Sequence, residues 1–100
     1  MANNEKSNNK RAKRIYLASK YVCKYLSEEW LTDDKSAREY GRLYGVHYHT
    51  IEKIMEKEGY NIPLFTLSII CFNKGVKLSD FFEMVENKYG PKLNDTFITK

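Results

Sequence analysis

The stretch from Ser36 to Met55, SAREYGRLYGVHYHTIEKIM, constrains the fold more than any other part of the chain. Ser36 suits a helix N-cap, and Glu39, three residues later, can bond back to the backbone N–H of the cap. Gly45 suits the left-handed conformation that ends a helix, and Val46 follows it as an apolar contact. The sequence therefore predicts a short helix that starts at Ser36 and ends in a sharp turn at Gly45.

A second helix is expected directly after that turn, over residues 47–56. Ile51 and Ile54 are spaced by three residues and supply its buried side. The other side chains of this segment are then left to face solvent or a partner. We predict that this second helix is the one that contacts the partner.

The same stretch resembles the helix-turn-helix of the lambda-repressor, Cro and Xre family. The resemblance rests on a small residue at Gly41, a glycine at Gly45, an apolar Val46 and branched aliphatic residues at Ile51 and Ile54. It continues through NIPLFTL and GVKLSDFF and covers about residues 15–84. The chain departs from the family in having Gly41 where alanine is usual. It also has His47-Tyr48-His49 where the family has a Ser/Gln/Arg-rich helix start. The resemblance implies an all-α fold of five helices, with the helix-turn-helix as the second and third.

Apolar periodicity predicts the remaining helices and the domain limits. We expect a first helix over 14–30, a fourth over 63–73 with an unusually wide apolar surface, and a fifth over 79–89 that stops at Gly90-Pro91. We divide the chain into a disordered basic arm (1–13), a helix-turn-helix domain (14–90) and a C-terminal tail (91–100). The tail contains a β-leaning run, 96–99, and the sequence leaves open whether this run pairs across a dimer or folds over the core.

Positive charge is unevenly spread along the chain. The formal net charge is +4, and residues 1–14 account for all of it, because residues 15–100 hold twelve basic and twelve acidic residues. The functional interpretation of the arm is contact with DNA phosphates or a minor groove, and the alternative is a solubilising tail.

By resemblance, we expect a sequence-specific DNA-binding transcriptional regulator of prokaryotic or phage type that acts as a homodimer on double-stranded DNA, either as a repressor that blocks polymerase or as an activator that recruits it. The alternative is a protein-interaction module on the same scaffold. The first turns of a recognition helix meet base edges, so the candidate base contacts are His47, Tyr48, His49 and Lys53. The candidate phosphate contacts are Ser36, Ala37, Arg38, Arg42, Thr50, Lys57 and Asn61. Three nearby carboxylates, Glu52, Glu56 and Glu58, oppose phosphate binding unless they are paired.

Other function classes find little support in the sequence. No arrangement of nucleophile and base and no phosphate-cradling glycine loop indicates an enzyme, and we expect no cofactor and no small-molecule ligand. His47 and His49, two positions apart on a helix, are expected to point in different directions, so we predict no metal site. Cys23 and Cys71 are expected to be buried free thiols in a cytoplasmic protein without a membrane span or signal peptide. The segment from Phe82 to Ile98 is our predicted dimer surface.

Overall fold

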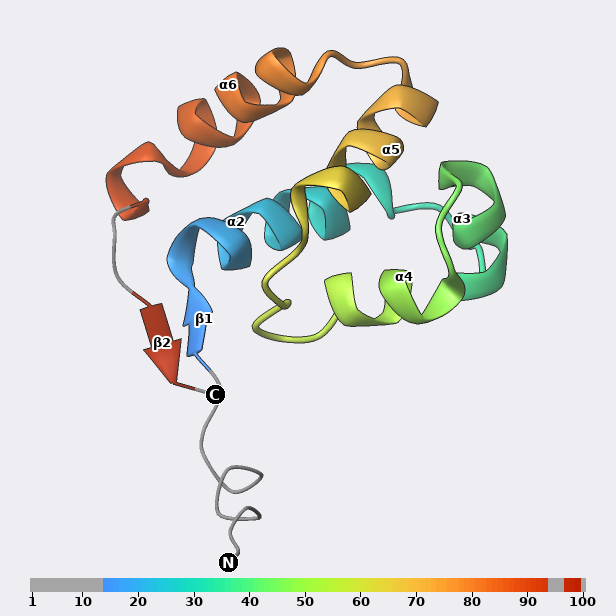
Figure 1. The fold of residues 1–100 in the computed structure, drawn as a ribbon, viewed down its shortest axis with the longest axis horizontal. Coiled ribbons are helices and arrows are strands. Elements are labelled where there is room, and N and C mark those ends of the chain that lie inside the picture. The colour runs from blue at the N-terminus through green and yellow to red at the C-terminus, as the bar shows by residue number, and fades with distance from the viewer. Residues whose placement is uncertain (1–13, 94–96, 100) are drawn as a thin grey trace, which may run out of the picture.

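The computed structural model describes residues 14–93 and 97–99, in which helices form almost the whole fold (Figure 1). The predicted basic arm, 1–13, lies outside the described residues. Within the described ranges, no helix is long and apolar enough to cross a membrane. In chain order the elements are β1 (Arg14–Tyr16), α2 (Leu17–Tyr25), the π-helix η1 (Leu26–Trp30), α3 (Ala37–Tyr44), α4 (Tyr48–Ile54), α5 (Leu64–Lys74), α6 (Leu78–Tyr89), the 3₁₀ turn η2 (Gly90–Lys92) and β2 (Phe97–Thr99).

The ends of α3 and α5 follow the local signals in the sequence. Ser36 and Glu39 form the predicted capping box: the Ser36 N–H donates to Glu39 Oε1 at 2.8 Å, and the Glu39 N–H donates to Ser36 Oγ at 3.2 Å. Gly45 and Gly75 end α3 and α5 in the left-handed conformation, with φ of 76° and 81°. Pro63 stands at the N-cap of α5, where its missing N–H leaves no unpaired donor.

The predicted first helix, 14–30, is wrong at its N-terminal end, and its C-terminal end at Trp30 is confirmed. Arg14–Tyr16 is a strand rather than the first helical turn, because β2 pairs with it in antiparallel register, Arg14 opposite Thr99 and Tyr16 opposite Phe97. At the other end the helix widens into η1, where the Leu31 N–H donates to the Leu26 carbonyl, five residues back, at 3.0 Å. The wider turn keeps Leu26, Trp30 and Leu31 together inside the core.

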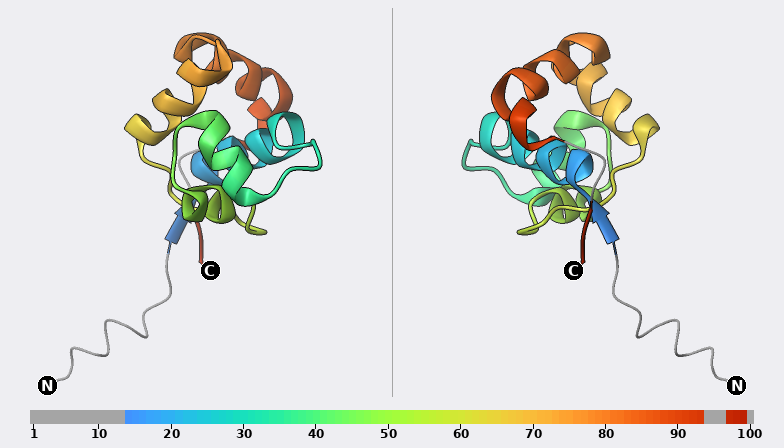
Figure 2. Two further views of the ribbon diagram at one scale, coloured as in Figure 1. Left: turned by 90° about the vertical axis from the view of Figure 1, so that its right-hand side faces the viewer. Right: turned by 90° about the vertical axis from the view of Figure 1, so that its left-hand side faces the viewer.

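The β1–β2 ribbon joins the tail to the start of the helical domain. The sequence left open whether the β-leaning run of the tail pairs across a dimer or folds over the core, and in the structure Phe97–Thr99 pairs with the strand that precedes α2. Ile15 on β1 is buried, so the ribbon belongs to the folded unit. Figure 2 shows the two strands side by side at one end of the helical body.

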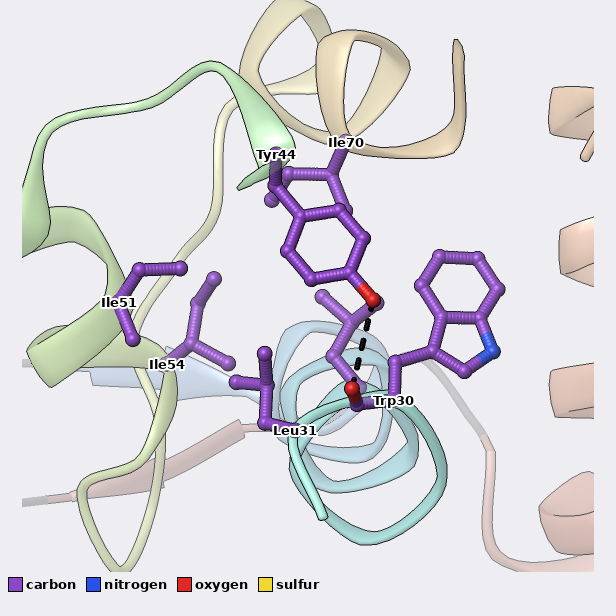
Figure 3. Close-up of a pocket in the computed structure, with 7 residues that line it drawn as sticks. Trp30, Leu31, Tyr44, Ile51, Ile54 and Ile70 are labelled. Atoms are coloured by element: carbon purple, nitrogen blue, oxygen red, sulfur yellow. Dashed lines mark hydrogen bonds between the residues drawn. The ribbon is translucent and has the colours of Figure 1, made fainter. Parts of the chain in front are cut away.

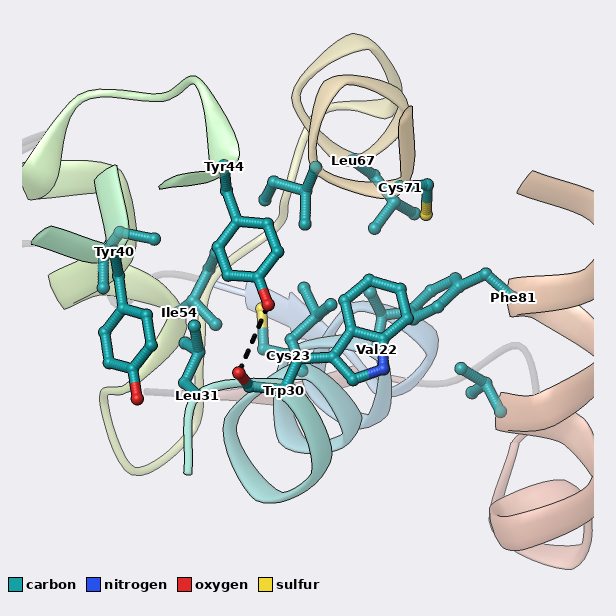
Figure 4. Close-up of a cluster of buried hydrophobic side chains, with 14 of the residues drawn as sticks. Val22, Cys23, Trp30, Leu31, Tyr40, Tyr44, Ile54, Leu67, Cys71 and Phe81 are labelled. Carbon is teal, nitrogen blue, oxygen red and sulfur yellow. Dashed lines mark hydrogen bonds between the residues drawn. The ribbon is translucent and has the colours of Figure 1, made fainter. Parts of the chain in front are cut away.

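An aromatic cluster joins the helices in the core (Figure 4). The Trp30 ring lies 5.2 Å from Phe81 on α6 and 6.4 Å from Tyr44 on α3, measured between ring centroids. The two buried tyrosines of α3 satisfy their hydroxyls locally: Tyr40 donates to the Asp33 carbonyl at 2.6 Å and Tyr44 to the Trp30 carbonyl at 3.3 Å. Buried phenolic oxygens need such partners. These bonds fix α3 against the end of η1.

The interior between η1, α3, α4 and α5 is filled by side chains. Figure 3 shows Trp30, Leu31, Tyr44, Ile51, Ile54 and Ile70 converging there, and the space between them does not admit a water molecule. The same packing buries both cysteines, which are free thiols as predicted. Burial raises the pKa of each thiol to about 11, and the Tyr60 carbonyl that accepts from Cys23 opposes the shift only in part.

Candidate nucleic-acid interface

Two short helices, α3 and α4, meet at a tight turn, and we call residues 36–54 the α3–α4 corner. Gly41 makes the turn possible, because a Cβ at this position would lie 2.7 Å from the Val46 carbonyl oxygen and 3.3 Å from the Tyr48 nitrogen. The Gly41 carbonyl in turn accepts from the N–H groups of both Gly45 and Val46. The backbone of the turn is therefore packed directly against α3, and the angle between the helices is fixed by backbone rather than by side chains.

His47 begins α4 as its N-cap, so the helix itself starts one residue later than the predicted 47–56 and ends at Ile54. His47 Nδ1 accepts from the His49 N–H at 3.1 Å, in the position that a Ser or Asp cap usually fills. Ile51 and Ile54 are buried as predicted. His47, His49 and Lys53 are exposed on the opposite side, and Tyr48 is half-buried between them and α3.

The rings of His47, Tyr48 and His49, which we call the ring cluster, lie against one another. Centroid distances are 4.6 Å for His47–Tyr48, 4.3 Å for Tyr48–His49 and 5.0 Å for His47–His49. The expectation that the two histidines point apart was wrong, because His47 has extended backbone and lies outside the helix. Arg38 of α3 stacks on Tyr48, its guanidinium carbon 3.9 Å from the centre of the ring. The cluster thus links α3 to the first turn of α4.

The two histidines present different hydrogen-bonding atoms to a partner. Since His47 Nδ1 accepts the backbone N–H, its neutral ring carries the proton on Nε2, which is then a donor. His49 Nδ1 lies 3.0 Å from Glu52 Oε1, and a carboxylate can only accept, so Nδ1 holds the proton and the Nε2 of the neutral ring is an acceptor. Sequence reasoning missed this role of Glu52, although its spacing of three residues from His49 on a helix is a usable signal.

Two arginines flank a shallow open pocket of about 250 Å³ at the corner. Its lining comes from both helices and the turn: Arg38, Gly41, Arg42, Val46, His47 and Tyr48. Within 14–93, neither Arg38 nor Arg42 forms an ion pair. Exposed guanidinium groups beside an open depression can bind an oxyanion in bidentate fashion.

The carboxylates near α4 are largely engaged elsewhere. Glu58 pairs with Lys20 of α2 at 3.3 Å, and Glu52 holds His49. The ion pair with Lys20 lowers the repulsion between Glu58 and a polyanion, whereas Glu52 keeps its negative charge beside a neutral His49 ring. Glu56, the third predicted opponent, is exposed beyond the end of α4.

Some predicted phosphate contacts have other partners. The N–H and the hydroxyl of Ser36 are both engaged in the capping box, which leaves the N–H groups of Ala37 and Arg38 as the open donors of the first turn.

The Asn61 side chain binds β1 with both of its polar atoms, donating to the Arg14 carbonyl at 2.7 Å and accepting from the Tyr16 N–H at 3.0 Å. Lys53 lies 5.6 Å from the Tyr60 ring centre, Lys57 is exposed, and Thr50 is half-buried. Arg38, Arg42 and the ring cluster therefore lie together at the corner, whereas Asn61 is bound to β1 of the ribbon.

Comparison with protein-family models, with curated proteins and with solved structures gave no match for this chain.

Proposed function

We propose that the protein is a sequence-specific DNA-binding regulator that uses the α3–α4 corner as a helix-turn-helix and presents the first turn of α4 to the major groove. The observation that carries this proposal is the ring cluster at the start of α4, in which His47 and His49 are exposed, bordered by two arginines that form no ion pair within residues 14–93. Polar ring atoms can read base edges, and unpaired guanidinium groups can bind phosphates. Both are held on one rigid corner.

The chemistry of the ring cluster suits base edges of the major groove. A donor at His47 Nε2 matches the N7 or O6 of guanine, and an acceptor at His49 Nε2 matches the exocyclic amino group of adenine or cytosine. The part of the Tyr48 ring that Arg38 and the two histidine rings leave open offers an apolar contact for a thymine methyl group. The corner thus provides three different recognition elements within one helical turn.

In this proposal, phosphates are bound by α3 and by the residues beyond α4. Arg38 and Arg42 lie one helical turn apart, and the open N–H groups of Ala37 and Arg38 add donors at the positive end of α3. Lys57 stands beyond the far end of α4 as a further exposed cation. These groups position the protein and carry no sequence information. Two such corners in a dimer, spaced by one turn of DNA at about 34 Å, would read two half-sites.

Selection of bound duplexes from a random pool tests the proposal. The parent chain is compared with a Tyr48→Ala/His49→Ala double variant and with Arg42→Ala. We expect the parent to enrich one sequence, the double variant to lose that enrichment, and Arg42→Ala to bind more weakly to all sequences and to reduce the salt slope by about one.

Lys92→Ala is the matched control, because it removes one exposed charge from η2, away from the corner. It should behave as the parent. Absence of enrichment by the parent at moderate salt contradicts sequence-specific binding. In that case a protein-contact module is the better account. The exposed apolar side chains of Leu43 on α3 and Met55 at the end of α4 favour it as the second candidate.

A further inference from the structure

The outer face of α5 carries large apolar side chains that nothing in the described structure covers. Phe72 is 83% exposed, Phe65 68% and Ile69 38%, and we call these three residues the apolar face of α5. The opposite side of the helix, with Leu67, Ile70 and Cys71 among others, is buried in the core. α5 is therefore apolar on two sides, and only one of them has a partner within the chain.

Among the described residues, no segment covers this face. α6, part of the predicted dimer surface, buries Phe81, Val85 and Tyr89 in the core, and β2 pairs with β1. The residues outside the described ranges read MANNEKSNNKRAK, NDT and a final Lys, and apart from Met1 they hold no large apolar side chain. The face is thus open to an occupant from another molecule.

The spacing of the apolar face is self-complementary. Phe65 and Phe72 are seven residues apart, which places them on the same side of the helix with about 10 Å between them along its axis. Their midpoint falls between Ser68 and Ile69. In an antiparallel pair of α5 helices related by a two-fold axis at this midpoint, Phe65 of each copy meets Phe72 of the other, and the two Ile69 side chains lie near the axis. A two-fold interface requires this kind of self-complementarity.

Charge and hydrogen bonding also fit a second copy. The only charged residue of α5 is Lys74, whose Nζ lies 5.4 Å from the centre of the Trp30 ring, so an uncharged partner surface is favoured. Ser68 Oγ already donates to the Phe65 carbonyl at 2.8 Å, and Asn73 Nδ2 donates to the carbonyls of Tyr44 and Ile69. Covering these groups therefore leaves no side-chain donor of theirs unpaired.

From this geometry we propose that two copies of the chain dimerise through the apolar face of α5, with the helices antiparallel. At about 200 Å² per ring, with Phe65 68% and Phe72 83% exposed, the four phenylalanines of the pair bury roughly 600 Å², which lies below the standard interface size even with neighbouring atoms included. The dimer is thus weak and reversible. It forms without DNA, so the inference does not rest on the proposed function.

Sedimentation equilibrium without DNA tests the pairing, from about 1 µM to about 1 mM, the range of weak association. We expect a reversible dimer whose dissociation constant rises at least roughly 30-fold in Phe72→Glu, the effect of losing a central aromatic residue. Since Phe72 is almost fully exposed, this variant should keep the parent's helix content by circular dichroism. Phe82→Glu on α6 is the control, and it should leave the dissociation constant within a few-fold of the parent.

Cross-linking checks the antiparallel register. Ser68→Cys places a thiol beside the two-fold axis and should form disulfide-linked dimers under mild oxidation, whereas Ser79→Cys, exposed on α6, should not. The native thiols add little background, because both are buried. A chain that stays monomeric up to about 1 mM, or a dimer weakened as much by Phe82→Glu as by Phe72→Glu, overturns the proposal. Either result leaves the duplex selection experiment unaffected, so the two proposals can fail separately.

Discussion

The α3–α4 corner and the side of the molecule formed by α2, η1 and α6 are both rich in cations, but their cations have different partners. On the second side Lys24 pairs with Glu28 at 2.9 Å, and Lys88 pairs with Glu29 at 2.6 Å. At the corner, Arg38 stacks on a ring and Arg42 has no ion pair within residues 14–93. Figure 1 shows α6 and α4 on opposite sides of α2.

The pKa values of the paired groups on the side formed by α2, η1 and α6 are shifted by these interactions. Hydrogen bonds from Lys24 and then Tyr89 lower the pKa of Glu28, and the bond to Glu29 raises the pKa of Lys88. Residues 15–100 thus have no net charge, but the pairing of cations with carboxylates differs from one region to the other. Whether a cation is available to a polyanion depends on its nearest carboxylate, which the net charge does not report.

The largest expected effect comes from distorting the corner while leaving the α2–α6 side intact. In Gly41→Ala the new Cβ would meet the backbone oxygen of Val46, which cannot move aside without shifting α4. We expect a loss of about 1–3 kcal/mol in the free energy of unfolding, the usual cost of overpacking, together with loss of specific DNA binding. Urea unfolding followed by fluorescence measures the first, and equal stability of variant and parent would contradict the packing argument.

Charge substitutions test the comparison directly. Arg42→Ala removes one positive charge and should weaken DNA binding roughly ten-fold at low salt, as expected for the loss of a charged hydrogen bond. The Glu28→Gln/Glu29→Gln double variant raises the net charge by two but frees lysines away from the corner, so we expect little gain in affinity. Titration of labelled duplex measures both. A larger effect from the double variant would show that overall charge, and not the corner, governs binding.

A smaller effect is expected from Glu52→Gln. The glutamine amide can donate as well as accept, so the His49 ring is no longer held in one tautomer. We expect the preference at a single base position to relax by a few-fold, while total affinity changes little. Comparing selected sequences for the variant and the parent measures this, and an unchanged preference would remove His49 from the base contacts.

The smallest expected effect concerns the cap of α3. Bonding to the Ser36 backbone N–H and hydroxyl lowers the pKa of Glu39, so its stabilising contribution is present above the ordinary carboxyl pKa and is lost as pH falls through the lowered value. Glu39→Gln should therefore flatten the acid side of the stability profile slightly. Thermal unfolding between about pH 5 and pH 2 measures this, with Glu83→Gln on α6 as the control for a carboxylate outside the cap.

Signals contained within a few residues predicted structure well, and signals shared between distant residues did not. Ser36, Glu39 and Gly45 act on their own helix ends, so the limits of α3 could be inferred from the sequence. The strand at Arg14–Tyr16 could not, because its partner lies at the other end of the chain and its own residues also fit a helical spacing. The exposure of the ring cluster followed from the burial of Ile51 and Ile54. Its stacking did not, because that arrangement depends on His47 acting as a cap.

The β1–β2 ribbon has a consequence for the order of folding. Its two strands are separated by every helix of the described structure, so pairing Ile15 with Ile98 closes a loop of almost the whole chain. The helices and their mutual contacts are more local and carry a smaller entropic cost, so they should form first. The ribbon is then the last element to form and the first to open. Pulsed amide exchange should show late protection of the Ile15 N–H, and early protection of that group would contradict this order. Opening the ribbon would leave β1 held to the helical body through its two bonds to the Asn61 side chain, while the aromatic core and the α3–α4 corner stay folded.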